Sequence, residues 1–213
     1  TVKVYSLTIV LLSAGIYYYS KYLNTPDRRK YLLISSVIFS SLIFTKIVFA
    51  VTFLVFVIFT LYISFKNRDE KKLLNLIGPL FVPPIIMTVI FFGLAGSNFG
   101  RLYFDLFQIN LIYKDLTPFS EDLPIFIYFF ILPQNLIVTV LALFSLKNAD
   151  KFRVFLILII ISFLLIHIQT RLLTEYNSSI LPLLIVLAVM GFENFWNYLR
   201  RILKNFSYER LIA

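Results

Sequence analysis

Two basic residues of this apolar chain, Lys46 and Arg171, have the chemistry to bind a phosphate group. Lys46 is the only charge within the apolar run 31–65, and Arg171 precedes Glu175 and Tyr176 in a short polar segment. A guanidinium pairs with two phosphate oxygens at once, and an ammonium meets them as a point charge. The alternatives are simpler: Lys46 reaches the headgroups from a helix end, and Arg171 pairs with Glu175 four residues later.

Three further candidates lie in or next to segments predicted on the same side of a membrane. Arg101 and Asp105 are four residues apart in the loop 97–123, a spacing that lets them pair on one helix face. Apolar residues interleave with these charges, which predicts an amphipathic helix near 100–113 in the interface plane. That helix is either an ordinary solvated element or the wall of an outward-facing cavity. His167, the single histidine, is better explained as an interfacial side chain than as a ligand or base.

The composition indicates an integral membrane protein. Of the 213 residues, 60% are apolar and 18% are aromatic, and the mean hydropathy is +0.88. A soluble domain of this length needs more charged surface than this chain provides. Several apolar runs approach or exceed the ~20 residues that cross a bilayer. We therefore predict an all-α fold, a polytopic transmembrane helical bundle.

The apolar runs predict about seven transmembrane spans. They cover residues 4–23, 31–65, 73–96, 124–146, 154–168 and 180–199. The run 31–65 holds 35 residues and has basic residues on both flanks. Both flanks should face the cytoplasm, so we expect this run to cross twice as a short hairpin that turns near Thr45.

The distribution of basic residues predicts the orientation. Fifteen of the 20 Lys and Arg residues fall on segments predicted to be cytoplasmic, and five fall outside. The cytoplasmic set comprises Lys21 and the basic residues of 24–30, 66–72, 147–153 and 200–213. We expect a protein of the cytoplasmic membrane, with the N-terminus of this segment outside and its C-terminus in the cytoplasm. The net charge of +9 then reflects loops near anionic headgroups and not nucleic-acid binding.

The sequence gives little support for a metal or redox centre. The chain has no cysteine and one histidine, which excludes disulfides and thiolate ligands. The acidic residues between 105 and 122 would hold a divalent metal only with partners from elsewhere. We predict no metal and no cofactor.

The order of these segments resembles the GT-C membrane glycosyltransferases, the relatives of protein O-mannosyltransferases and aminoarabinose transferases. The matching segments are the hairpin 31–65 with Thr45-Lys46 at its turn, Arg171 and Tyr176, Leu181-Pro182-Leu183, and Gly191-Phe192-Glu193. The resemblance covers most of this chain but only the C-terminal half of such an enzyme. We therefore expect residues 1–213 to form a single transmembrane domain, the C-terminal part of a longer chain.

The resemblance implies a reaction at the extracytoplasmic face. The donor is a polyprenyl-phosphate-linked sugar, and a carboxylate activates the acceptor. Lys46, Arg171 and Tyr176 are the expected donor-binding residues, because the leaving group is a lipid phosphate at headgroup depth. The acidic first outer loop of the family has no counterpart in this sequence, so no catalytic residue is assigned. The expected partners are membrane lipid and the lipid-linked sugar.

Two other functions fit the same composition. A non-catalytic structural or assembly subunit would keep the scaffold without a catalytic carboxylate, and its partners would be other membrane subunits. A transporter usually has broken helices and charges near the middle of its spans. Gly78-Pro79 and Pro83-Pro84 are expected to break one helix, and Pro133 to interrupt another. No acidic residue is predicted at mid-span, so a transporter is the least favoured of the three.

Overall fold

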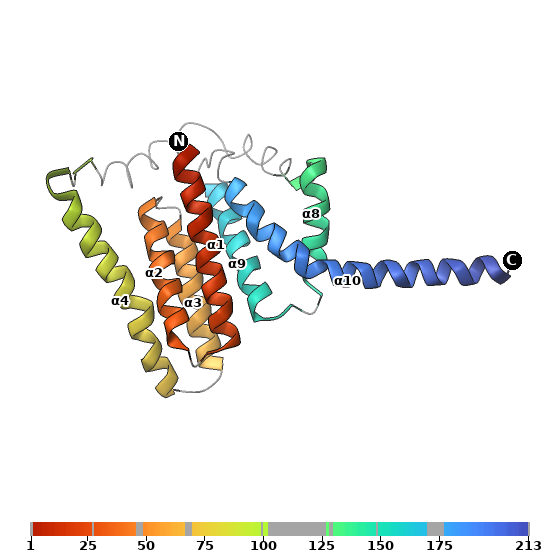
Figure 1. Cartoon of the computed structure of the whole chain (residues 1–213), viewed down its shortest axis with the longest axis horizontal. Coiled ribbons are helices and arrows are strands. Elements are labelled where there is room, and N and C mark those ends of the chain that lie inside the picture. The colour runs from red at the N-terminus through yellow and green to blue at the C-terminus, as the bar shows by residue number, and fades with distance from the viewer. Residues whose placement is uncertain are drawn as a thin grey trace.

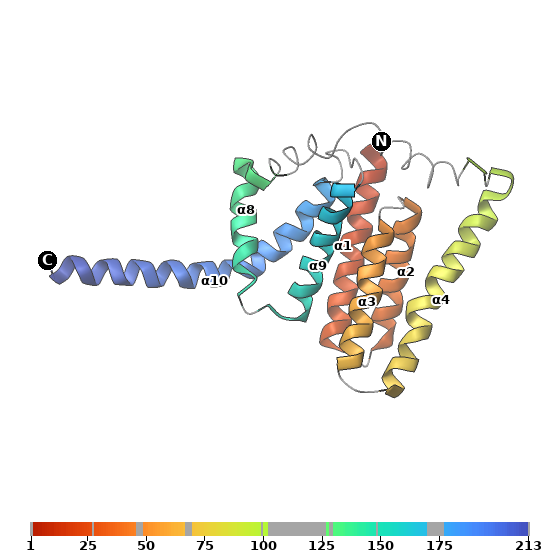
Figure 2. The same ribbon diagram turned by 180° about the vertical axis from the view of Figure 1, so that it is seen from behind.

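The computed structural model of the chain describes residues 2–26, 28–45, 49–66, 70–98, 100–101, 127, 130–147, 149–169 and 177–212. This part of the chain is all-helical and contains seven α-helices. They are α1 (Val2–Asn24), α2 (Arg29–Thr45), α3 (Ala50–Lys66), α4 (Glu70–Ala95), α8 (Pro133–Phe144), α9 (Lys151–Gln169) and α10 (Asn177–Ile212). Helices α1, α2, α3 and α9 form the centre of the bundle, with α4 beside α2 on one flank and α8 against α10 on the other (Figures 1 and 2).

The run 31–65 forms the two helices that the sequence predicts. Helix α2 ends at Thr45 and α3 begins at Ala50, so the connection falls at the expected turn. At the lower end of the bundle in Figure 1, α1, α3 and α8 end and α2, α4 and α9 begin. We call this the basic end. The basic residues of its helix ends and connections whose side chains the structure describes are Lys21, Arg28, Arg29, Lys30, Lys66, Lys147, Lys151 and Arg153.

An aromatic cluster fills the centre of the bundle, where α1, α2, α3 and α9 meet. The ring of the fully buried Tyr19 lies 4.4 Å from that of Phe155 and 5.0 Å from that of Phe56, and Phe56 lies 4.9 Å from Phe39. The Tyr19 hydroxyl is 2.9 Å from Thr60 Oγ1. Thr60 donates its own proton to the carbonyl of Phe56 at 2.7 Å, so Tyr19 is the donor to Thr60. Burial of this phenol is therefore compensated by a hydrogen bond that ties α1 to α3.

Helix α4 differs from the sequence expectation, because its prolines do not break it. It is continuous from Glu70 to Ala95 with three prolines inside, at positions 79, 83 and 84. Pro84 has no N–H, so the carbonyl of Leu80 loses its partner within the helix. Ser36 of α2 donates its hydroxyl to that carbonyl at 3.2 Å. A neighbouring helix thus replaces the missing bond, which is how prolines are tolerated inside membrane helices.

Two helices contain segments that are long and apolar enough to cross a membrane, Asn75–Leu94 in α4 and Ile180–Lys204 in α10. Both expose large apolar side chains: Leu94 is 82% exposed and Val189 is 71% exposed. In water each such side chain would forgo about 1.5–3 kcal/mol of burial. Helices α2 and α3 have 17 residues each and α8 has 12, fewer than the ~20 of a straight span. By length and composition alone, two helices are candidate spans, and seven crossings stay a prediction.

Helices α8 and α10 pack with their backbones in contact, along what we call the α8–α10 seam. A Cβ added at Gly191 would collide with the carbonyl oxygen of Leu141 and would lie 2.8 Å from the amide nitrogen of Ser145. One turn further along α10, the side-chain amide of Asn194 donates to the carbonyls of Phe144 at 3.1 Å and Lys147 at 3.0 Å. Asn194 thus satisfies carbonyls at the C-terminal end of α8, which has no helical partners for them.

Candidate functional site

Most of the predicted donor-binding and outer-loop residues lie outside the described part of the chain. These are Lys46, Asp105, Arg171, Glu175 and Tyr176. Arg101 is described and exposed, shortly after the 3₁₀ turn Gly96–Asn98. His167 belongs to α9, but its side chain is not among those described, and the interfacial helix expected near 100–113 is described only at 100–101. The mutual geometry of these side chains stays a prediction.

The described helix ends next to these segments lie together, at the end of the bundle opposite the basic end. Helix α2 ends at Thr45, directly before Lys46 in the sequence. Helix α9 ends at Gln169 and α10 begins at Asn177, on either side of the segment that contains Arg171. Figure 1 shows these three helix ends at the top of the bundle. The segments that contain Lys46 and Arg171 therefore connect to described helices at the same end of the bundle.

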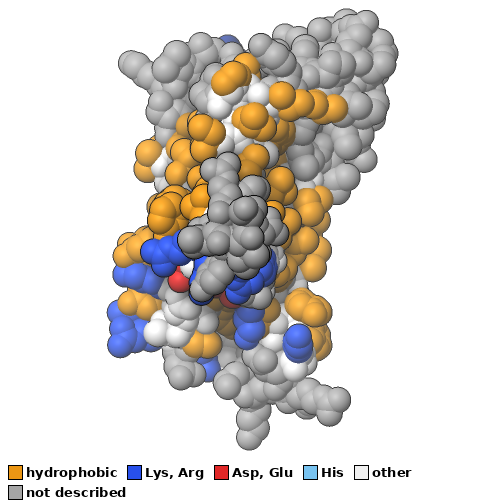
Figure 3. Space-filling view, turned by 90° about the vertical axis from the view of Figure 1, so that its right-hand side faces the viewer, with side chains coloured by type: hydrophobic (Ala, Val, Ile, Leu, Met, Phe, Trp, Pro, Cys, Tyr) orange, Lys and Arg blue, Asp and Glu red, His pale blue; other side chains and the backbone are white. Residues whose placement is uncertain are grey.

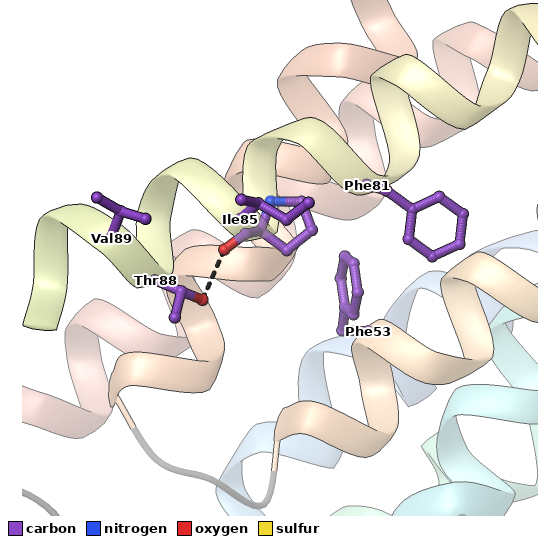
Figure 4. A pocket seen from close by; sticks show the side chains of 6 residues that line it. Phe53, Phe81, Ile85, Thr88 and Val89 are labelled. Carbon is purple, nitrogen blue, oxygen red and sulfur yellow. Dashed lines mark hydrogen bonds between the residues drawn. The ribbon is translucent and has the colours of Figure 1, made fainter.

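An open apolar groove of about 380 Å³ lies between α3 and α4 (Figure 4). Its lining residues are Phe53 of α3 and Phe81, Pro84, Ile85, Thr88 and Val89 of α4. Thr88 is the only polar residue among them, and its hydroxyl donates to the carbonyl of Pro84 at 2.7 Å (Figure 4). The groove therefore offers a ligand hydrocarbon contacts and no hydroxyl proton.

The groove lies toward the same end of the bundle as the connection from α2 to α3. Phe53 is in the first turn of α3, and Val89 is in the second half of α4, which runs toward that end. Helix α4 leans away from the central helices in this direction (Figures 1 and 2). Phe44 of α2 stacks on Phe91 of α4 with ring centroids 4.4 Å apart, so these two helices stay in contact next to the groove.

At the basic end, cations lie against aromatic rings. Lys21 Nζ is 4.5 Å from the ring centroid of Tyr17 and 5.7 Å from that of Tyr31. The guanidinium carbon of Arg200 is 5.3 Å from the ring of Trp196. Tyr and Trp rings paired with cations are typical of the boundary between membrane and water. The Lys21 pairs belong to the basic end and the Arg200 pair to α10; which side of a membrane this end faces stays a prediction.

The sequence pattern does not predict the groove. The prolines at 79, 83 and 84 predict a broken helix, whereas Pro84 lies in a continuous helix and forms part of the groove wall. The signal that could have found this role is Ser36, a hydroxyl at a buried position of the preceding hairpin. A helix with internal prolines needs such a donor from a neighbour if it is to continue.

Within the described residues, no group of three or more His, Cys, Asp or Glu side chains is arranged to hold a metal ion. No family model, no curated protein and no solved structure matches the chain.

Proposed function

We propose that the chain is the C-terminal membrane half of a glycosyltransferase that takes its sugar from a polyprenyl-phosphate donor at the extracytoplasmic face. The observation that carries the proposal is the apolar groove between α3 and α4. It lies toward the end of the bundle where α2 ends before Lys46 and where α9 and α10 flank the segment of Arg171. A polyprenyl phosphate is a long hydrocarbon that ends in an anion, so it needs an apolar surface that leads to cations.

The groove is suited to the hydrocarbon part of such a donor. Its volume of about 380 Å³ falls within the range of ligand pockets, about 300–1,000 Å³. Soluble ligands are usually oriented by a few polar groups in such a pocket, but Thr88 has its proton bound to the carbonyl of Pro84. A branched apolar chain gains from contact with the rings of Phe53 and Phe81 and needs no polar partner.

The cations are suited to the phosphate part. When the sugar leaves, negative charge grows on the lipid phosphate, and fixed cations at that position stabilise the transition state. Lys46 follows α2 directly, and Arg171 follows α9 by two residues. Of the described side chains, none is assigned as the catalytic carboxylate. That group is expected from the family's acidic outer loop, outside this sequence.

The test is a binding measurement with two ligands, carried out on the full-length protein in detergent micelles. A labelled polyprenyl phosphate reports on the groove and the cations together, and a polyprenol of equal length reports on the groove alone. Lys46→Met and Arg171→Met should each weaken binding of the phosphate by roughly tenfold or more, the value of a charge-assisted hydrogen bond. Binding of the polyprenol should not change. Lys66→Met is the matched control, because Lys66 lies at the basic end.

Two outcomes would count against the proposal. Equal affinity for both ligands in the wild type and in both variants would remove the phosphate contact. A wild-type protein that binds neither ligand would overturn the function and favour the second candidate, a non-catalytic subunit of a membrane complex.

A further inference from the structure

The C-terminal half of α10 extends beyond the rest of the bundle. Its last described ring contacts with α8 are those of Phe195 and Tyr198 with Phe144, at centroid distances of 5.1 and 5.6 Å. The helix continues from there to Ile212. Figures 1 and 2 both show this part running sideways from the lower end of α8, across the direction of the central helices. Such a direction suits a helix that lies along a membrane surface.

One side of this projecting helix is apolar. With 3.6 residues per turn, Phe192, Trp196, Leu199 and Leu203 fall within an arc of about 60°. Phe192 is 53% exposed, Trp196 45% and Leu203 64%. The stripe continues the exposed face of the preceding turns, where Ile185 and Val189 fall on the same side. An exposed apolar face therefore runs along α10 from Ile185 into the projecting part.

The adjoining side is polar and mainly basic. Its exposed residues are Glu193, Asn197, Arg200, Arg201 and Lys204, which share an arc of about 100°. Trp196 and Arg200 lie where the two arcs meet, and the guanidinium is 5.3 Å from the indole ring. An indole beside an arginine combines an apolar body with a cation that reaches toward water, the arrangement found at headgroup depth.

The surface around the projecting helix is also divided into a basic part and an apolar part. Viewed along the projecting helix, Lys and Arg side chains gather around it and below it, and hydrophobic side chains cover the surface above (Figure 3). The backbone of Lys147 lies next to α10, because its carbonyl accepts the hydrogen bond from Asn194. Cations concentrated at one level, with hydrocarbon on one side of them, complement a layer of anionic headgroups.

We propose that α10 from residue 192 onward is an in-plane membrane helix that binds anionic phospholipid headgroups at the cytoplasmic surface. The apolar stripe enters the acyl layer, and Arg200, Arg201 and Lys204 contact the lipid phosphates. This inference rests on the membrane location in the proposed function and not on the transfer reaction. The occupant is a lipid surface because the apolar stripe forms the C-terminal part of the apolar segment Ile180–Lys204 and is bordered by three cations with one carboxylate. In this arrangement the segment does not cross as one straight span, because α10 changes direction and leaves the bundle sideways (Figures 1 and 2).

A site-directed labelling scan of the reconstituted full-length protein tests the proposal. The chain has no cysteine, so single cysteines carry a spin label without background. Labels at 192, 196 and 203 should be protected from a water-soluble relaxation agent, and labels at 193, 197 and 201 should be several-fold more accessible. This alternation has the period of a helix that lies flat. A helix that crosses the membrane would instead show accessibility that changes steadily with residue number, and that result would overturn the proposal.

The dependence on lipid charge is tested with vesicles of phosphatidylcholine alone and with one quarter phosphatidylglycerol. The single tryptophan, Trp196, is a native reporter that brominated lipids quench. Quenching should rise with the anionic lipid, and Arg200→Gln with Arg201→Gln should remove this rise. Quenching that is equal in both vesicles would contradict headgroup recognition. A stripe that is protected from the aqueous agent but is not quenched by brominated lipid would indicate a protein partner instead.

A label at Ile86, exposed on α4, separates failure of this inference from failure of the membrane location. If Ile86 is inaccessible to the aqueous agent while the α10 stripe is accessible, only the in-plane helix is rejected. If Ile86 is accessible too, the membrane location is wrong and both proposals fall.

Discussion

The α8–α10 seam and the α3–α4 groove are two helix contacts built in opposite ways. In the seam, Gly191 lets two backbones meet, and Asn194 adds hydrogen bonds to the facing carbonyls. In the groove, the rings of Phe53 and Phe81 line a space that stays open. Apolar burial gives little driving force between helices in lipid, so tight association depends on small residues and hydrogen bonds. Bulky apolar faces leave room that lipid can occupy.

The strongest way to break the seam is to add one carbon at its closest point. Gly191→Ala places a Cβ against the carbonyl of Leu141, and backbone atoms cannot move aside as a flexible side chain would. We expect a loss of about 1–3 kcal/mol in the free energy of unfolding, measured by denaturant titration in micelles. Gly93→Ala is the matched control, because nothing lies within 4 Å of its added Cβ. It should be neutral or gain up to about 1 kcal/mol from helix propensity. Equal effects of the two substitutions would contradict the close contact.

A smaller loss should follow from removing the hydrogen bonds of the seam without changing its packing distance. Asn194→Ala leaves the carbonyls of Phe144 and Lys147 without this donor. We expect a loss of about 1–2 kcal/mol, together with faster amide exchange in the last turn of α8. Asn197→Ala is the control, because Asn197 lies three residues further along α10 and is exposed. Its free energy of unfolding should stay within about 0.5 kcal/mol of the wild type. A stable Asn194→Ala protein would mean that packing alone holds the seam.

On the other side of the molecule, Ser36→Ala tests the bond that keeps α4 continuous beside the groove. The substitution removes the hydroxyl that donates to the Leu80 carbonyl. Pro84 cannot donate to this carbonyl, because it has no N–H. We expect a loss of about 0.5–1.5 kcal/mol, since interhelical hydrogen bonds in membranes are often weak. Ser41→Ala is the control, because Ser41 donates to the carbonyl of Val37 within its own helix. If the two substitutions lower the free energy of unfolding equally little, water or lipid must supply the hydrogen-bond donor to the Leu80 carbonyl.

These contacts mark the limit of what the sequence alone could predict. The helices and the hairpin with its turn near Thr45 follow from apolar run lengths and basic flanks, which are local properties of the chain. The continuity of α4 does not follow, because it depends on Ser36, which lies 44 residues before Leu80 and donates its hydroxyl to the Leu80 carbonyl. Gly191 was interpreted only as part of a closing motif, although its role depends on where Leu141 lies. The groove is a consequence of how two helices diverge, which no single run of residues encodes.

The smallest effect on stability is expected in the groove, and the largest effect on binding. Ile85→Trp puts a bulky ring into an open space at a side chain that is 62% exposed. No neighbour has to move, so the free energy of unfolding should change by no more than about 0.5 kcal/mol, as for other surface substitutions. Affinity for a polyprenol should nevertheless fall, because the new ring occupies the space that the hydrocarbon would use.

Ile86→Trp is the matched control: it is the next residue of the same helix, is 50% exposed and does not line the groove. Loss of polyprenol binding in the first variant alone would locate the hydrocarbon between α3 and α4. Equal binding in both would mean that the groove is ordinary lipid-facing surface, and a large loss of stability in Ile85→Trp would show that the contact is packed as tightly as the seam.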